Sequence, residues 1–288
     1  MKILLTGADG QLGNEIRYLS GSYPQYEFLY TDFGDLDITI ARDVDQFFAD
    51  HRPEVVINCA AYTSVDKAET EEASAYMVNS KAPGILAMAS SKYNCLLFHV
   101  STDYVFEGTG HRPLLETDTA SPQSVYGKSK LAGEKAVSNF ASRGIILRTS
   151  WLYSAYGNNF VKTILKRGRE QGALNIVSDQ VGTPTYAHDL AKIILDMIPQ
   201  AISFKGVQIF HFSDEGIASW YDFANAIVEI SGIDCKVIPI STQEYPLPAE
   251  RPCYSVLDKS KLKKQFKIEI PYWRESLKHC LGRLEGEY

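Results

Sequence analysis

The chain has 288 residues, of which 45% are hydrophobic, and a formal net charge of −6 at pH 7. This length and apolar content suffice for one large domain plus a smaller one, each with a buried core. The negative charge, without any basic run, argues against a nucleic-acid partner, and no apolar run is long enough for a membrane span.

The cysteines are odd in number and widely scattered, at Cys59, Cys95, Cys235, Cys253 and Cys280. This pattern predicts free thiols rather than a disulfide framework or a zinc site. Because the sequence opens directly on an apolar strand, we expect no cleaved leader and a cytoplasmic location.

The amino-terminal apolar run leads into Gly7, Gly10 and Gly13 and then into a helix expected near residues 11–20. Glycines let the backbone approach a pyrophosphate, whose charge is stabilised at a helix amino terminus. The spacing is Gly-x-x-Gly-x-x-Gly, not the usual Gly-x-Gly-x-x-Gly. A second β-rich stretch ends in Asp32, about 20 residues after the turn, where a ribose hydroxyl would be met. The sequence therefore predicts a dinucleotide site; the alternative is a strand-to-helix turn without ligand.

Two further apolar runs follow, at residues 54–63 and 96–106. The first ends in small residues, which leave room for a flat ring. The second ends in hydroxyls and a carboxylate, as expected at the crevice edge of an open α/β sheet. Thr102 is therefore a candidate hydrogen-bond donor to a carbonyl oxygen, or else a turn residue at a strand end. His99, inside the apolar run, is predicted to be a core residue.

Tyr126 and Lys130 lie four residues apart in the segment 124–130. On a helix this spacing places their Cβ atoms ~6 Å apart, so that an ammonium can favour the ionised form of the phenol. Bringing the pKa of a phenol from ~10 to neutrality takes roughly 4 kcal/mol. One cation about 4 Å away, at an effective dielectric constant of ~20, supplies an interaction of that order. The pair predicts a tyrosine acid in a hydride-transferring enzyme, unless the spacing is a chance feature of an amphipathic helix.

Strands alternate with helical patterns up to about residue 150, which predicts a doubly wound parallel sheet, a Rossmann-type α/β fold. Besides the first helix, helices are expected near residues 40–51, 66–92 and 122–142.

The alternation loosens after Trp151. A later strand is expected at 207–212, and Ser219–Asp222 has the capping-box pattern of a helix start. We place a dinucleotide-binding domain at 1–152 and a smaller, mixed α/β, mainly substrate-binding domain at 153–288. A site for an anionic substrate would need local cations, for which the candidates are Lys162, Lys166, Arg167 and Arg251.

These residues resemble the extended short-chain dehydrogenase/reductases and, among them, the dTDP-4-dehydrorhamnose reductases. The likeness covers nearly the whole chain, with matching segments at 60–69, 101–106, 126–134, 148–153, 157–160, 179–185 and 251–252. The Tyr-Lys pair defines only the superfamily. The Thr-Asp-Tyr-Val-Phe, Arg-Thr-Ser-Trp and Asp-Gln-x-Gly-x-Pro-Thr blocks indicate this reductase rather than a sugar epimerase.

The resemblance implies that the C4 keto group of dTDP-4-dehydro-L-rhamnose is reduced to dTDP-L-rhamnose by NADPH or NADH. It implies that Tyr126 protonates the oxygen, that Lys130 holds the nicotinamide ribose, and that Thr102 binds the carbonyl. The implied cofactor residues are Gly7, Gly10, Gln11, Leu12, Gly13, Asp32, Asp37, Ile38, Ala60, Ala61, Tyr62 and Thr63, with Tyr126 and Lys130. The implied substrate residues are Val65, Thr102, Asp103, Tyr104 and Trp151, although Trp151 equally suits a core position. A return of the chain to the first domain is also implied.

Members of this family pair through a magnesium site that uses acidic side chains, one of them at the position of Glu15. The second carboxylate position is His188 here, with Asp189 next to it. We therefore expect no metal, while a homodimer stays possible.

Two other functions stay open. A nucleotide-sugar epimerase or dehydratase shares the Tyr-Lys pair but retains its cofactor and consumes no added NAD(P)H. The regulatory subunit of methionine adenosyltransferase also resembles this reductase and acts as a binding protein. The presence of Thr102, Tyr126 and Lys130 argues against the second alternative.

Overall fold

The computed structural model describes residues 1–286, and its centre is a six-stranded sheet with strand order β10-β5-β4-β3-β1-β2. Every pairing in this sheet is parallel. The strands are β1 (Lys2–Thr6), β2 (Glu27–Thr31), β3 (Val55–Asn58), β4 (Leu96–Thr102), β5 (Arg143–Thr149) and β10 (Gly206–His211). The predicted doubly wound parallel sheet is confirmed, and the late strand expected at 207–212 is its edge strand β10.

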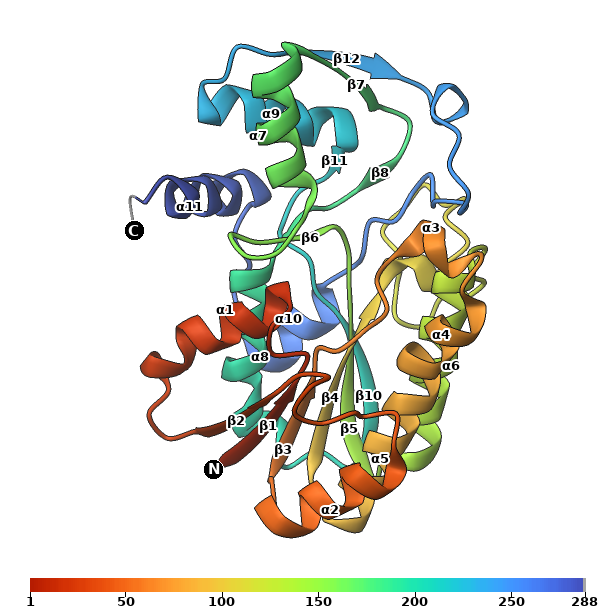
Figure 1. Ribbon diagram of the computed structural model, residues 1–288, viewed down its shortest axis with the longest axis vertical. Coiled ribbons are helices and arrows are strands. Elements are labelled where there is room, and N and C mark those ends of the chain that lie inside the picture. Colours follow the sequence, from red (N-terminus) through yellow and green to blue (C-terminus); the bar gives the residue numbers. More distant parts are fainter. Residues whose placement is uncertain (287–288) are drawn as a thin grey trace.

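Helices cover both faces of the sheet (Figure 1). One core contains Ile3 and Leu5, together with α1 (Gln11–Leu19) and α8 (Ala187–Ala201). The other contains Leu4, together with α2 (Ala41–His51), α5 (Ala82–Lys92) and part of α6 (Val125–Phe140). Because successive side chains of a strand point to opposite faces, one continuous apolar strand serves both cores.

The single helix expected at 66–92 is wrong in part. The chain instead forms α3 (Val65–Ala68), α4 (Glu72–Tyr76), a π-helical turn (Met77–Lys81) and then α5. Pro83 lies in the first turn of α5 and has no N–H, so it cannot donate to the carbonyl of Asn79 four residues earlier. The helix passes this point in a π register, which re-aims Asn79.

A second layer lies above the carboxyl ends of the sheet in Figure 1. There α7 (Phe160–Gln171), α9 (Trp220–Ser231) and α11 (Trp273–Glu285) pack around a separate apolar core. The predicted capping box at Ser219 and Asp222 is present at the start of α9. Two parallel strands, β7 (Ala173–Val177) and β12 (Lys236–Ile240), belong to this layer.

The chain after residue 152 serves both layers, since β10, α8 and α10 (Ser260–Phe266) pack in or against the main sheet. The division at 152 stays a prediction. The remaining short elements are β6 (Leu152–Tyr153), β8 (Val181–Gly182), β9 (Thr185–Tyr186), β11 (Ala218–Ser219) and the 3₁₀ turns Ser20–Ser22, Asp103–Val105 and Thr242–Glu244.

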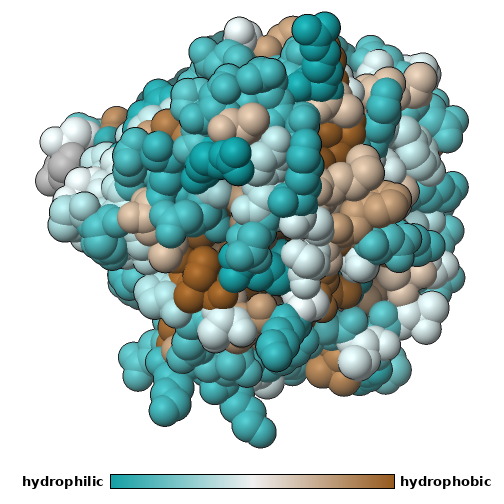
Figure 2. All heavy atoms as spheres, turned by 90° about the horizontal axis from the view of Figure 1, so that it is seen from below, coloured by the Kyte–Doolittle hydropathy of each residue, from teal (hydrophilic) through white to brown (hydrophobic). Residues whose placement is uncertain are grey.

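The face at the lower end of the sheet is shown in Figure 2. Hydrophilic side chains predominate there and hydrophobic ones are interspersed among them. Within residues 1–286, no helix has the length and apolar character needed to cross a bilayer. All five cysteines are free thiols.

Candidate active site

The glycine turn packs directly against the chain that follows β3. Gly7 has φ +70°, and a Cβ atom on it would lie 2.6 Å from the Ala60 nitrogen. A Cβ on Gly13 would collide with the Gly7 carbonyl. Gly10 is the N-cap of α1 and brings no side chain over the helix terminus. Any side chain at Gly7 or Gly13 would disrupt this turn, which keeps backbone amides open to a pyrophosphate.

Asp32 follows β2 beside this turn. Its Oδ2 accepts a hydrogen bond from the Asp9 nitrogen at 2.9 Å, and its Oδ1 accepts one from the Phe33 nitrogen at 2.8 Å. These bonds fix the carboxylate, while each oxygen keeps a lone pair for a ribose hydroxyl. Asp37, next to the buried Ile38, accepts from the Thr39 backbone and hydroxyl. The two carboxylates and the glycine turn together fit a dinucleotide bound at the carboxyl ends of β1, β2 and β3.

Sequence reasoning missed Asn79, which fixes the remainder of this edge. Its Oδ1 accepts from the Tyr62 nitrogen at 2.8 Å, and its Nδ2 donates to the Tyr62 carbonyl and to Ser129 Oγ, both at 3.0 Å. Ser129 lies on α6, so one amide joins the expected cofactor segment to the helix that carries Tyr126. The signal that would have revealed Asn79 is Pro83, four residues later.

Thr102, Tyr126 and Lys130, called the tyrosine centre below, meet at the carboxyl end of β4. Tyr126 and Lys130 lie on α6, which Ser124 caps by accepting from the Gly127 nitrogen at 3.1 Å. A Cβ on Gly127 would collide with the Tyr104 carbonyl, so α6 approaches the end of β4 only because this residue is glycine. The predicted catalytic residues are therefore brought together.

The expected effect of Lys130 on Tyr126 is wrong for the free protein. Burial raises the pKa of Tyr126 to about 12, opposed by a hydrogen bond with Thr102. Burial also lowers the pKa of Lys130 to about 8, opposed by the nearby carboxylate of Glu134. Lys130 Nζ donates to the Val100 carbonyl at 2.7 Å. Desolvation raises the pKa more than the Thr102 hydrogen bond lowers it, so Tyr126 holds its proton and is available as a donor.

The expected substrate residues fall into two groups. Asp103 is buried and its Oδ1 accepts from Thr102 Oγ1 at 3.0 Å, while the rings of Tyr104 and Tyr126 lie edge to face with centroids 5.5 Å apart. Within residues 1–286, Asp103 Oδ2 has no hydrogen-bond partner. Asp103 and Tyr104 therefore form one wall with the tyrosine centre.

Trp151 follows β5, two residues after Thr149, the cross-strand partner of Thr102. Its backbone has φ +48°, and its ring stacks on Trp220 with centroids 3.6 Å apart and planes 9° apart. A Cβ on Gly182 would lie 2.7 Å from the Trp151 ring. Val65 is the first residue of α3 and is half-buried. Trp151 thus supports Trp220, a second residue that sequence reasoning missed and for which we find no sequence signal.

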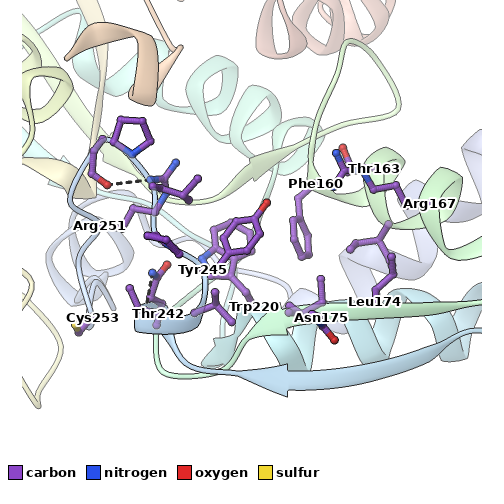
Figure 3. Close-up of a pocket in the computed structure, with 18 of the residues that line it drawn as sticks. Phe160, Thr163, Arg167, Leu174, Asn175, Trp220, Thr242, Tyr245, Arg251 and Cys253 are labelled. Carbon is purple, nitrogen blue, oxygen red and sulfur yellow. Dashed lines mark hydrogen bonds between the residues drawn. The ribbon is translucent and has the colours of Figure 1, made fainter. Parts of the chain in front are cut away.

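A cavity of about 1020 Å³ lies between α7, β7, the start of α9 and the segment 242–251. In Figure 3, Arg251 and Arg167 lie at opposite sides of this cavity, with Phe160, Trp220 and Tyr245 between them. Two of the four predicted cations therefore line it.

Lys162 and Lys166, the other two predicted cations, line a smaller cavity of about 400 Å³ between α7 and α11. The structure therefore does not gather the four cations at one site.

Glu15 is fully buried and engaged within the chain. Ser154 Oγ donates to its Oε1 at 2.6 Å, while Arg283 Nη1 donates to its Oε2 at 2.6 Å and His188 Nδ1 lies 3.2 Å from the same oxygen. The guanidinium of Arg283 thus neutralises the carboxylate. In the described part of the chain, no group of three or more His, Cys, Asp or Glu side chains could hold a metal ion. The expectation of no metal stays a prediction.

Comparisons with known proteins agree with this geometry. The model of the family described as "RmlD substrate binding domain" matches residues 1–285. A dTDP-4-dehydrorhamnose reductase of Aggregatibacter actinomycetemcomitans is 42% identical over 99% of each chain. A probable dTDP-4,6-dihydroxy-2-methyloxan-3-one 4-ketoreductase of Streptomyces antibioticus is 39% identical over 97% of this chain and 94% of its own.

Among solved structures, the dTDP-4-dehydrorhamnose reductase of Bacillus anthracis in complex with NADP is 36% identical. It superposes with a TM-score of 0.94, covering 98% of this chain and 99% of that one. Because the family model and these relatives span nearly the full length, the chain belongs to the RmlD family, that of the dTDP-4-dehydrorhamnose reductases.

Proposed function

We propose that this chain is a dTDP-4-dehydrorhamnose reductase that uses NADH or NADPH. The observation that carries the proposal is the half-buried Tyr126, hydrogen-bonded with Thr102 at the carboxyl end of β4, on the same edge of the sheet as the glycine turn. A donor of this kind suits the oxygen of a carbonyl that receives a hydride. The relatives named dTDP-4-dehydrorhamnose reductase, one of them solved with NADP, support the same activity.

The residues that would hold the cofactor are the glycine turn, Asp32, Asp37 and the segment 60–63, with Lys130 at the nicotinamide ribose. When bound, the reduced nicotinamide supplies the hydride. Tyr126 donates its proton to the C4 oxygen and Thr102 orients that oxygen. Lys130 Nζ, which donates to the Val100 carbonyl at 2.7 Å, is held in place by that bond at the end of β4.

The nucleotide half of the substrate is assigned to the 1020 Å³ cavity. Its aromatic side chains, Phe160, Trp220 and Tyr245, suit a base and deoxyribose, and Arg251 at one side suits a diphosphate. The sugar then lies against Val65, Asp103 and Tyr104, with C4 at Tyr126. Trp151 contributes to the nucleotide cavity by stacking on Trp220.

The sugar configuration is the part of this proposal that most needs a test, because the Streptomyces antibioticus relative carries the name of a different 4-ketoreductase. A misplaced ring hydroxyl leaves buried polar groups unpaired, at ~1–3 kcal/mol each, hence a roughly 10- to 100-fold loss in rate. We expect the L-lyxo 4-keto sugar, already epimerised at C3 and C5, to be the good substrate.

The test supplies dTDP-4-keto-6-deoxy-D-glucose with and without a 3,5-epimerase and follows oxidation of NADH and NADPH. Oxidation that depends on the epimerase supports dTDP-L-rhamnose as the product. Rapid oxidation without it would assign a reductase that makes a D-configured sugar. No oxidation with either isomer, but isomerised sugar, would favour an epimerase.

The surroundings of the enzyme are proposed from the same activity. A reductase that makes a nucleotide-sugar precursor for cell-surface polysaccharide acts in the cytoplasm, where sugar nucleotides and NAD(P)H are available. A homodimer is compatible with the fold. Light scattering of the purified protein tests this state directly.

A further inference from the structure

The segment 242–251, called the strap below, forms one wall of the large cavity and is anchored at both ends by carboxylates. At its start, the Thr242 hydroxyl donates to Asp179 Oδ1 at 2.6 Å. At its end, the Ala249 nitrogen donates to Asp66 Oδ1 at 3.2 Å. The anchor at Asp66 crosses from the second layer to α3, on the side of the expected cofactor segment. The hydrogen bond between Ala249 and Asp66 therefore joins the strap to α3, two segments that are far apart in the sequence.

Arg251, also in the strap, binds the same carboxylate with both arms of its guanidinium. Nη1 donates to Asp66 Oδ1 at 3.0 Å and Nη2 donates to Oδ2 at 2.7 Å. Nη1 uses its second N–H on the Ala249 carbonyl at 3.0 Å. One N–H on Nη2 and the N–H on Nε are left without a partner in residues 1–286, a fork that suits a phosphate.

The position of Arg251 connects the cavity with the tyrosine centre. It lines the cavity, and its charge acts on Tyr104, whose ring contacts Tyr126. Between the two anchors, Tyr245 and Leu247 are 47% and 40% exposed and face the cavity. The strap thus combines a fixed cation at the inner end of the cavity with apolar side chains that a nucleoside would cover.

We propose that Asp66 is a positioning residue for the nucleotide-sugar substrate, which holds Arg251 and the end of the strap where the guanidinium meets the diphosphate. The proposal rests on the function proposed above. Asp66 does not touch the substrate; it acts by fixing the direction of the Arg251 fork. Its loss should therefore weaken substrate binding and leave cofactor binding unchanged.

The test is Asp66→Asn, which keeps an acceptor for the Ala249 nitrogen but removes the charge that holds both arms of Arg251. We expect the KM for the nucleotide sugar to rise about tenfold, equivalent to about 1.4 kcal/mol, with kcat and the KM for NADH changed less than about twofold. The matched control is Asp118→Asn, which breaks the two-armed pair of Asp118 with Arg112, 2.9 Å at each arm, away from the cavity. The control should leave all three constants unchanged.

A second readout asks whether Asp66 acts through Arg251. The partner variant in a double-mutant cycle is Arg251→Lys, which keeps the charge but loses the fork. The double variant should lose less affinity for the nucleotide sugar than the two single variants lose when their losses are added. Additive losses, an unchanged substrate KM in Asp66→Asn, or an equal rise in the KM for NADH would overturn the proposal. If Asp66→Asn does not fold, Asp66→Glu provides the same comparison with a displaced carboxylate.

Binding of dTDP alone, measured by calorimetry, separates this proposal from the proposed function. Asp66→Asn should weaken dTDP binding about tenfold relative to the wild type. A wild type that binds dTDP but oxidises no cofactor with either sugar isomer contradicts the proposed function. The same dTDP affinity in both proteins overturns the role of Asp66 alone.

Discussion

The tyrosine centre lies on one strand and one helix, whereas the cavity next to it is bounded by α7, β7, the start of α9 and the strap. Thr102 ends a buried strand, and Tyr126 and Lys130 lie on one helix that packs over that strand. The cavity takes Phe160 and Arg167 from α7 and Trp220 from the start of α9, while the strap, which closes one side, has little regular structure.

In the proposed function the tyrosine centre performs the chemistry and the cavity recognises the substrate. In the tyrosine centre Thr102 and Lys130 are buried and Tyr126 is half-buried, and the raised pKa of Tyr126 keeps the proton on its phenol. The cavity exposes aromatic and cationic side chains that the chain itself does not cover. The proposed proton donor therefore lies at the end of the main sheet, while one wall of the proposed substrate cavity is a loop segment, where sequence can vary without disturbing the sheet.

The largest effect is expected from Tyr126→Phe, which removes the proton donor and little else. We expect kcat to fall ~100-fold or more, the usual scale for a positioned acid, with cofactor affinity largely kept. The measurement is steady-state oxidation of NADH together with cofactor titration. Tyr93→Phe, which removes a hydroxyl that binds Asp45 far from the centre, is the matched control. Near-normal turnover in Tyr126→Phe would require a different acid.

The same division explains what the sequence could predict. The glycine turn, Thr102, Tyr126 and Lys130 were predictable because strand ends and helix spacing fix where such residues meet. The direction of the Tyr126 pKa was not, since burial depends on everything packed around the ring. The four-residue spacing predicts that Tyr126 and Lys130 share a helix face. It does not predict the dielectric environment that sets their pKa values.

The cavity was predictable only in part. Arg251 and Arg167 were among the expected cations, but Lys162 and Lys166 lie at another cavity, because one helix presents these side chains on different faces. Trp220 was missed, since its role depends on stacking against Trp151 from a distant segment. Contacts between segments that are far apart in sequence leave no local pattern.

The next effect tests the cavity by itself. Trp220→Leu removes a ring that stacks on Trp151 and contacts Phe160, with centroids 4.7 Å apart in the second pair. We expect the KM for the nucleotide sugar to rise about tenfold, since stacking on an aromatic ring contributes on the order of 1–1.5 kcal/mol. The kcat at saturation should change less than about threefold. Trp220→Phe should restore most of the affinity, and a loss confined to kcat would remove the assigned role of the cavity.

A smaller effect is expected in cofactor choice. The carboxylate of Asp32 lies where it would accept from a ribose hydroxyl and repel a 2′-phosphate. NADH should therefore be used at least as well as NADPH. Asp32→Ser should move the ratio of the two kcat/KM values several-fold toward NADPH. A strong NADPH preference in the wild type contradicts the assigned role of Asp32.

The last effect concerns stability rather than rate, at the border between the two regions, where Asp103 is buried beside Thr102. Burial raises the pKa of Asp103 to about 6, opposed by its hydrogen bonds. Well below pH 4 the carboxyl is protonated in both the folded and the unfolded chain, so ionisation has no effect on folding. As the pH rises through about 4, the unfolded chain loses its proton first and the free energy of unfolding decreases. The decrease ends above pH 6, once the folded chain has lost its proton too.

Asp103→Asn removes this ionisation while keeping an acceptor for the Thr102 hydroxyl. The change in the free energy of unfolding that the substitution causes should therefore be more favourable at pH 7.5 than at pH 4.5. The difference should be on the order of 1–3 kcal/mol, or a few degrees in melting temperature for a chain of this size. Thermal unfolding of both proteins at the two pH values measures it, because groups common to both cancel. An equal difference at both pH values would mean that Asp103 is solvated in the free enzyme, so that the wall beside the tyrosine centre opens to water as the cavity does.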